Sequence, residues 1–254
     1  MSRTAAVARA FGAAADYDRH AGVQRRVAGS LAERIAASPL AARPHVLDVG
    51  AGTGFLPALL MPRLPGARWV ISDLSAEMVQ RARAALPAGS GQFVAMDAAM
   101  PCFADGGFDL VCSNLAAQWF DDLAGSIAAL AGLVAPGGLL ALSTLARGSF
   151  AEWRRAHEAL GLAAATPDFP DAAALAALAP AGMTAAIVVE SFARRHDDAA
   201  DLLRGLRGLG ATVPRPGRKP LGPKAMRAVM RQFETMGATI SYEIAYCLFR
   251  RGEG

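Results

Sequence analysis

Strands and helices are predicted to alternate along the first 145 residues. Val23, Val27, Leu31 and Ile35 recur every four residues, which predicts an amphipathic helix. Apolar runs predict buried strands over 45–50, 68–75, 92–97, 108–114 and 139–145. Apolar positions at helical spacing predict helices over 54–64, 76–86, with Ser75 as its N-cap, and 123–134. Strands that alternate with helices favour a parallel sheet with right-handed crossovers.

The pattern changes after about residue 150. Helices are predicted over 150–162, 197–209 and 224–236, and strands over 184–195 and 240–249. The last strand alternates strictly, and we expect it to be added antiparallel at the edge of the mostly parallel sheet. The roughly forty residues between these two strands are too many for a plain loop. They predict a helical insertion or lid.

Composition and charge narrow the class of protein. The 254 residues are 53% hydrophobic and 19% charged, enough for a substantial core, with no apolar run typical of a membrane span or secretory signal. Cys102, Cys112 and Cys247 are scattered, which argues against a disulfide framework or a zinc site and for a cytoplasmic location. The net charge of +4 indicates either an arginine-rich proteome or an acidic partner. Because the basic residues are not interleaved with aromatic ones, nucleic acid is not the expected partner.

The run Asp48-Val49-Gly50-Ala51-Gly52-Thr53-Gly54 follows the first predicted strand. Glycines there permit close approach of the backbone to a ligand, although an ordinary tight turn has the same composition. A phosphate-binding loop would end in Gly-Lys-Ser/Thr, and a dinucleotide loop would have GxGxxG; the chain has neither. Asp48 would also repel a pyrophosphate. The loop therefore favours a nucleoside ligand without phosphates.

Two further carboxylates close the next two predicted strands. Asp73 lies about twenty residues beyond the loop, where an acidic side chain can accept both hydroxyls of a ribose. Asp97 could accept a hydrogen bond from the exocyclic amine of adenine. Each aspartate alone is more often a helix cap or a turn residue than a ligand. Together with Asp48 they predict a pocket for a nucleoside with a cationic tail, which is S-adenosylmethionine.

The motifs DVGAGTG, SDLSAEMVQRAR, DAAMPCFADGGFDLVCSN and APGG resemble the class I S-adenosylmethionine-dependent methyltransferases over residues 40–145. The resemblance implies an α/β fold with a Rossmann-like, seven-stranded, mostly parallel sheet whose last strand is antiparallel. A helical N-terminal segment and a helical lid insertion would be added to it. The cofactor contacts that it implies are Asp48, Gly50, Ala51, Gly52, Gly54, Asp73, Leu74, Met78, Asp97, Ala98 and Asn114. No metal is implied.

A narrower resemblance covers nearly the whole chain. FGAAADYDRHAGVQRRVAGSLAERI, SNLAAQWFDDL, STLARGSFAEW, LLRGLRGLGATVPRPGRKPLG and ISYEIAYCLFRR are similar to the malonyl-[acyl-carrier protein] O-methyltransferases of biotin synthesis. The resemblance implies methylation of the free carboxylate of malonyl carried on acyl-carrier protein or coenzyme A. The alternative is a methyltransferase acting on another small carboxylic acid or on a quinone-type molecule. We expect one domain over 1–254, with an N-terminal helical cap (1–40), a cofactor-binding core (41–146) and a substrate and lid part (147–254).

The resemblance and the positions of polar residues suggest the catalytic and substrate-binding groups. A malonyl carboxylate is already ionised at neutral pH, so no general base is required. Tyr17 could cover the sulfonium or hold the carboxylate, or simply anchor the core; Asn114 could contact the methyl group or cap its strand. Arg147 could pair with the carboxylate, although arginines after strands are often exposed. Gln118 and Trp119 are expected at the substrate, with Trp119 also a candidate for a packed wall.

The stretch VPRPGRKPLGPK carries Arg215, Arg218 and Lys219 among prolines and glycines. Acyl-carrier protein is acidic, so this basic part of the lid could steer it electrostatically. A solvated loop is the alternative interpretation. We expect no nucleic acid or membrane as partner.

Overall fold

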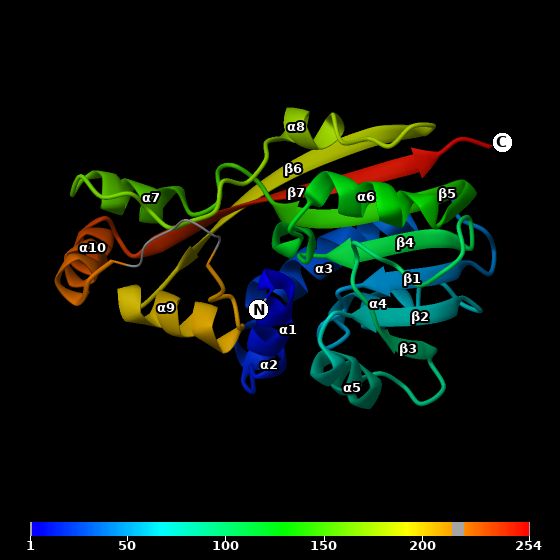
Figure 1. The fold of residues 1–254 in the computed structure, drawn as a ribbon, viewed down its shortest axis with the longest axis horizontal. Helices are drawn as coiled ribbons and strands as arrows, with labels where there is room; N and C mark the ends of the chain where they lie inside the picture. The colour runs from blue at the N-terminus through cyan, green and yellow to red at the C-terminus, as the bar shows by residue number, and fades with distance from the viewer. Residues whose placement is uncertain (1, 215–220, 254) are drawn as a thin grey trace.

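In the computed structural model, which describes residues 2–214 and 221–253, the chain forms a seven-stranded sheet in the order β3-β2-β1-β4-β5-β7-β6 (Figure 1). The strands are β1 (His45–Val49), β2 (Arg68–Asp73), β3 (Gln92–Ala95), β4 (Phe108–Asn114), β5 (Val134–Leu145), β6 (Met183–Arg195) and β7 (Thr239–Arg251). The first five are parallel, and β7 runs antiparallel to both of its neighbours. The predicted fold class is confirmed.

The predicted place of the last strand was wrong. β7 is not at the edge but lies between β5 and β6, and β6 is the edge strand. The reason is burial: most residues of β7 are buried or half-buried, whereas β6 is largely exposed along its length. A buried strand has little water to satisfy its backbone N–H and C=O groups and pairs on both edges, whereas an exposed strand can leave one edge to solvent.

Alternate residues along the strands point to opposite faces of the sheet, where they form two hydrophobic layers. On one face Val46, Leu110 and other sheet residues pack with α3 (Gly22–Ala36) and α4 (Phe55–Leu60). On the other face Leu47, Val111 and their neighbours pack with α6 (Leu123–Gly132) and α8 (Ala172–Ala176). The predicted cap of α5 (Ala76–Ala85) is confirmed, because Ser75 Oγ accepts a hydrogen bond from Met78 N at 3.3 Å. Among the described residues no helix is long and apolar enough to cross a membrane.

The helices and strands differ from the prediction in three places. β5 starts at Val134 and includes the APGG turn, because Gly137 (φ 73°) bends the chain and the pairing of β5 with β4 continues across an irregularity. Two helices that were not predicted precede α3: α1 (Arg3–Gly12) and α2 (Tyr17–His20), which begins at Tyr17. The short helix α8 between α7 and β6 was not predicted.

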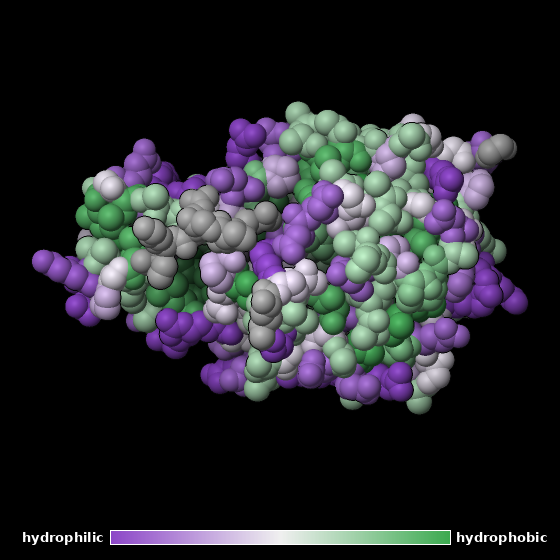
Figure 2. Space-filling view, in the orientation of Figure 1, coloured by the Kyte–Doolittle hydropathy of each residue, from purple (hydrophilic) through white to green (hydrophobic). Residues whose placement is uncertain are grey.

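The ends of β6 and β7 continue past the parallel strands to a group of three helices. These are α7 (Ala151–Glu158), α9 (Ala199–Gly208) and α10 (Pro223–Thr235), at the left of Figure 1. The helices α1 and α2 lie between this group and the ends of the parallel strands. In the same orientation, Figure 2 shows hydrophilic side chains across the middle of the molecule. We call α9 and α10 the lid.

Candidate active site

The glycine loop after β1 brings other elements close to the backbone. Gly50, Gly52 and Gly54 all have left-handed φ angles, of 71°, 57° and 92°. A side chain at Gly50 would place its Cβ 2.5 Å from Cβ of Ala116, and one at Gly52 would lie 3.4 Å from the Tyr17 hydroxyl. At Gly50 both the conformation and the space therefore require glycine, and at Gly52 the conformation does.

Asp73 fastens this loop to the end of β2. Its Oδ2 accepts a hydrogen bond from Gly52 N at 2.9 Å, and its Oδ1 accepts one from Ser75 N at 2.8 Å. Burial raises the pKa of Asp73 above its ordinary value, while the backbone N–H groups of Ser75, Gly52 and Leu74 oppose the rise. A carboxylate has about four lone-pair sites, so Asp73 can still accept a hydrogen bond from a ligand.

The loop, Asp73 and the ends of β3 and β4 enclose a cavity of about 210 Å³, which we call the strand-end chamber. Predicted cofactor contacts that line it are Gly50, Gly52, Asp73, Leu74, Met78, Asp97, Ala98 and Asn114. Thr4, Val7 and Phe11 of α1 complete its wall. Carboxylate acceptors beside apolar walls and a glycine backbone fit the sugar, base and sulfonium of S-adenosylmethionine.

Three of the predicted cofactor contacts do not line this chamber. Gly54 starts α4 against Leu86, and Ala51 N donates to Ser72 O at 2.9 Å. Asp48 lies beneath the loop, 1% exposed, where it accepts a hydrogen bond from the Cys112 thiol at 3.6 Å. Burial raises the pKa of Asp48 to about 7; the thiol lowers it and the charge of Asp73 raises it further.

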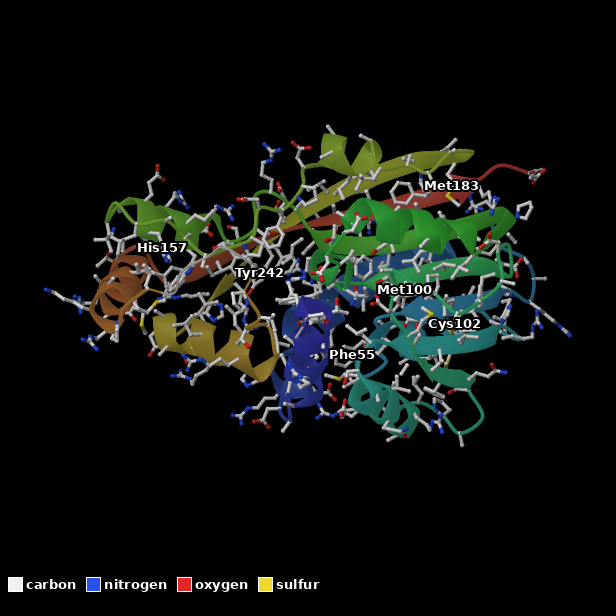
Figure 3. The ribbon with its side chains drawn as sticks, viewed as in Figure 1. Phe55, Met100, Cys102, His157, Met183 and Tyr242 are labelled. Atoms are coloured by element: carbon white, nitrogen blue, oxygen red, sulfur yellow. The ribbon has the colours of Figure 1, made fainter. Side chains whose placement is uncertain are left out.

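A second cavity of about 310 Å³ lies between the N-terminal helices, the lid and the ends of β6 and β7; we call it the aromatic chamber. Its walls include Phe150, Trp153, Phe169 and Tyr242. Figure 3 shows Tyr242 near the middle of the molecule, close to the N-terminal end of β7. Burial raises the pKa of Tyr242 to about 12, so its hydroxyl remains protonated at neutral pH.

The two chambers share the residues Phe11, Tyr17, Leu115 and Trp119, which we call the junction. The Tyr17 ring is stacked on Phe55 with centroids 6.4 Å apart, and Trp119 meets Phe11 edge to face at 5.2 Å. Burial, and then the charges of Asp73 and Asp18, raise the pKa of Tyr17 well above its ordinary value. The phenol at the junction is therefore a hydrogen-bond donor and not a base.

Two predicted site residues, Asn114 and Gln118, form hydrogen bonds that hold the chain around Leu115 of the junction. Asn114 donates through Nδ2 to Gln24 O at 3.1 Å and accepts from Ser143 Oγ at 2.9 Å. Gln118 lines the aromatic chamber and donates to Leu115 O at 2.6 Å. Leu115 has a left-handed φ of 50°, a conformation that costs energy in a leucine and that these contacts help to hold.

Arg147 is outside both chambers. Its side chain is 71% exposed and pairs with Asp171 at 2.7 Å. The loop after β5 is turned away because Gly148 N donates to Glu243 Oε2 at 2.6 Å. Arg215, Arg218 and Lys219 lie outside the described residues.

Several chamber residues were not predicted. Val7 and Phe11 are one helical turn apart on α1, a spacing that could have indicated a wall. Tyr242 alternates with half-buried positions in the last strand, but nothing local indicates what it faces. Within 2–214 and 221–253, no group of three or more histidine, cysteine or acidic side chains is placed to hold a metal ion.

Comparisons with known proteins agree with this geometry. A family model described as "Methyltransferase domain" matches residues 47–142. The chain is 37% identical to the malonyl-[acyl-carrier protein] O-methyltransferase of Magnetococcus marinus, over 98% of this chain and 94% of that protein. It is 44% identical to the biotin biosynthesis bifunctional protein BioCD of Bordetella avium, again over 98% of this chain, and spans 53% of that longer relative.

A solved structure supports the fold. The YcgJ protein from Bacillus subtilis superimposes with a TM-score of 0.62 over 89% of this chain and 99% of its own, at 16% sequence identity. At that identity the similarity concerns the arrangement of the strands and helices alone.

Proposed function

Because the chain belongs to the malonyl-[acyl-carrier protein] O-methyltransferase family, we propose that it transfers a methyl group from S-adenosylmethionine to the free carboxylate of malonyl on acyl-carrier protein. The observation that carries the proposal is the meeting of two chambers at one junction, Phe11, Tyr17, Leu115 and Trp119. One chamber has the carboxylates that a nucleoside needs, and the other has about 310 Å³ of space with largely apolar walls for an acyl group.

S-adenosylmethionine, when bound, supplies an electrophilic methyl group. In the proposed arrangement Asp73 accepts the ribose hydroxyls, Asp97 accepts from the adenine amine, and Leu74 and Met78 form the apolar wall. Gly50 and Gly52 allow the backbone to approach the ligand closely. Asp48, Ala51 and Gly54 do not line the chamber. Their proposed role is to hold the glycine loop in the conformation that binds the cofactor.

The chain's own contribution to the transfer is alignment and the exclusion of water. A malonyl carboxylate has a pKa of about 4 and is already a nucleophile at neutral pH, so neither a base nor a metal ion is required. The protonated Tyr17 hydroxyl can orient it by donating a hydrogen bond. Alignment of this kind contributes up to roughly 7–11 kcal/mol in favourable cases, and the aromatic junction keeps water away.

The proposal extends to the carrier protein. We propose that Arg215, Arg218 and Lys219, which lie between α9 and α10 in the sequence, steer the acidic acyl-carrier protein, and that the enzyme acts in the cytoplasm. Replacing the three by glutamate should raise KM for malonyl-[acyl-carrier protein] and leave KM for malonyl-coenzyme A unchanged. An equal rise for both substrates would remove them from docking.

The direct test uses methyl-labelled S-adenosylmethionine and malonyl-[acyl-carrier protein], with mass spectrometry of the product. We expect a mass gain of one methyl group on the malonyl moiety, reversed by mild ester hydrolysis. Acetyl-[acyl-carrier protein], which has no free carboxylate, is the control and should gain none. Labelling of another small acid, or of a quinone precursor, with none on malonyl, would keep the methyltransferase class and remove the proposed substrate.

A further inference from the structure

One arginine of the aromatic chamber uses only one edge of its guanidinium group. Arg3 is the first residue of α1, and its side chain is 11% exposed. Its Nη1 donates to the carbonyl oxygen of Trp119 at 3.0 Å and pairs with the carboxylate of Asp121. Its Nε is buried, and neither Nε nor Nη2 hydrogen-bonds to any residue that the structure describes.

The unused edge has the geometry of a carboxylate site. The Nε–H and Nη2–H groups point in parallel from one side of a guanidinium and match the two oxygens of a carboxylate. A buried donor without a partner costs free energy, and a ligand that supplies the partner recovers it. Asp121 is half-exposed, so solvent screens its charge and leaves Arg3 able to attract a second anion.

The position of Arg3 is at the reacting end of the aromatic chamber. Arg3 lines this chamber together with Gln118, and its bond to Trp119 ties it to the junction. Arg194 also lines the chamber, but it is exposed and comes from the end of β6, beside Gly22. Arg147 is outside and already paired with Asp171.

We propose that Arg3 binds the free carboxylate of the acyl substrate and selects the acid over its methyl ester; this rests on the proposed function. Methyl transfer removes the negative charge of the carboxylate. The ester therefore loses the ion pair with Arg3, and its release is favoured as soon as it forms. Arg3 is thus a specificity residue for both substrate entry and product departure.

The test measures binding without turnover. The full chain is saturated with S-adenosylhomocysteine, and malonyl-pantetheine or its methyl ester is titrated in a calorimeter. The wild type should bind the acid at least about tenfold more tightly than the ester, the size expected for a charge-assisted hydrogen-bonded pair. In Arg3→Gln this ratio should fall to about one, and Arg3→Lys should retain part of it. Arg34→Gln is the matched control, because Arg34 is half-buried, pairs with Glu190 and lines neither chamber.

A second variant, Asp121→Asn, distinguishes substrate binding by Arg3 from a purely structural role of Arg3 in fastening α1. Asp121→Asn breaks the ion pair but keeps the arginine, so the acid-to-ester ratio should stay at or above the wild-type value. Equal loss of the ratio in Asp121→Asn and Arg3→Gln would show that Arg3 only fastens α1, and would overturn the proposal. So would a loss confined to Arg194→Gln, or a wild type that binds acid and ester equally.

Failure of the proposed function can be distinguished from failure of the role proposed for Arg3. If the wild type prefers the acid in this titration but methylates no malonyl thioester, the site for a carboxylate stands and the reaction does not. If it methylates malonyl and Arg3→Gln keeps the full acid-to-ester ratio, the reaction stands and the role of Arg3 does not.

Discussion

The two chambers that meet at the junction are built in different ways. The strand-end chamber consists mainly of the ends of adjacent parallel strands, and backbone N–H groups hold its central carboxylate, Asp73. The aromatic chamber collects side chains from α1 to α3, the loops after β4 and β5, the lid and β7. One is therefore fixed by the hydrogen-bond network of the sheet, and the other by packing between elements that are distant in the sequence.

This difference suggests a division of labour. A cofactor common to many methyltransferases can be bound by the rigid part, which tolerates little change. The acceptor can be chosen by the part in which helices and loops pack against each other and single substitutions adjust the shape. Substitutions at the strand ends should consequently alter cofactor affinity and folding, whereas those around the aromatic chamber should alter KM for the acyl substrate.

The largest effect is expected beneath the strand-end chamber. The pKa of Asp48 is about 7 in the folded chain and about 4 when unfolded, so the folded state binds more protons between these values. Stability should therefore fall as the pH rises from 4 to 7, by on the order of 4 kcal/mol for three pKa units. Asp48→Asn should remove that fall, as measured by urea unfolding at several pH values.

Cys112→Ala sharpens this prediction, because the thiol lowers the pKa of Asp48 by donating a hydrogen bond to it. Its loss should extend the fall in stability to higher pH. The aromatic chamber offers the contrast: Tyr242, with a pKa raised to about 12, is neutral in both states below pH 9 and adds no such dependence. An unchanged pH profile in Asp48→Asn would mean that the buried acid does not titrate in this range.

The second largest effect is expected for Asp73→Asn, which should weaken cofactor binding. An amide has one acceptor where the carboxylate has two, so one of the N–H groups of Gly52 and Ser75 loses its partner. We expect the affinity for S-adenosylhomocysteine to fall roughly 100-fold, about 3 kcal/mol, by calorimetry. Asp109→Asn is the control: Asp109 also accepts a backbone hydrogen bond, from His45 N at 2.7 Å, but lines neither chamber. Similar losses in both would point to general destabilisation.

The same contrast explains what the sequence could predict. The glycine loop, Asp73, Asp97 and Met78 form the strand-end chamber because each follows a strand or starts a helix, and parallel strands bring their ends together. Asp48 was predicted to contact the cofactor but lies beneath the loop, because one residue along a strand decides whether a side chain faces the ligand side or the layer below.

The aromatic chamber could be predicted only in part. Tyr17 and Trp119 were found through the family resemblance and not through a local pattern. Arg147 follows its strand as expected, yet the loop direction depends on Glu243, almost a hundred residues later. Arg3 and Tyr242 come from opposite ends of the chain, and only the packed fold brings them to one cavity. Non-local packing of this kind leaves no periodic signal in a sequence.

The smallest effect, and the one specific to the aromatic chamber, is expected in α9. A Cβ at Gly208 would lie 2.1 Å from Cδ2 of His20, whereas one at Gly205 would lie 4.0 Å from the same ring. Gly208→Ala should push the lid away from α2 and raise KM for the malonyl substrate roughly threefold to tenfold, with the affinity for S-adenosylhomocysteine unchanged. Gly205→Ala makes the same exchange in the same helix without the clash, and should instead stabilise the chain by up to about 1 kcal/mol. Steady-state kinetics and thermal unfolding of the pair decide the matter: if Gly208→Ala weakened cofactor binding as much as it raised KM, the two chambers would not be mechanically separate, and the rigid part would depend on the lid as well.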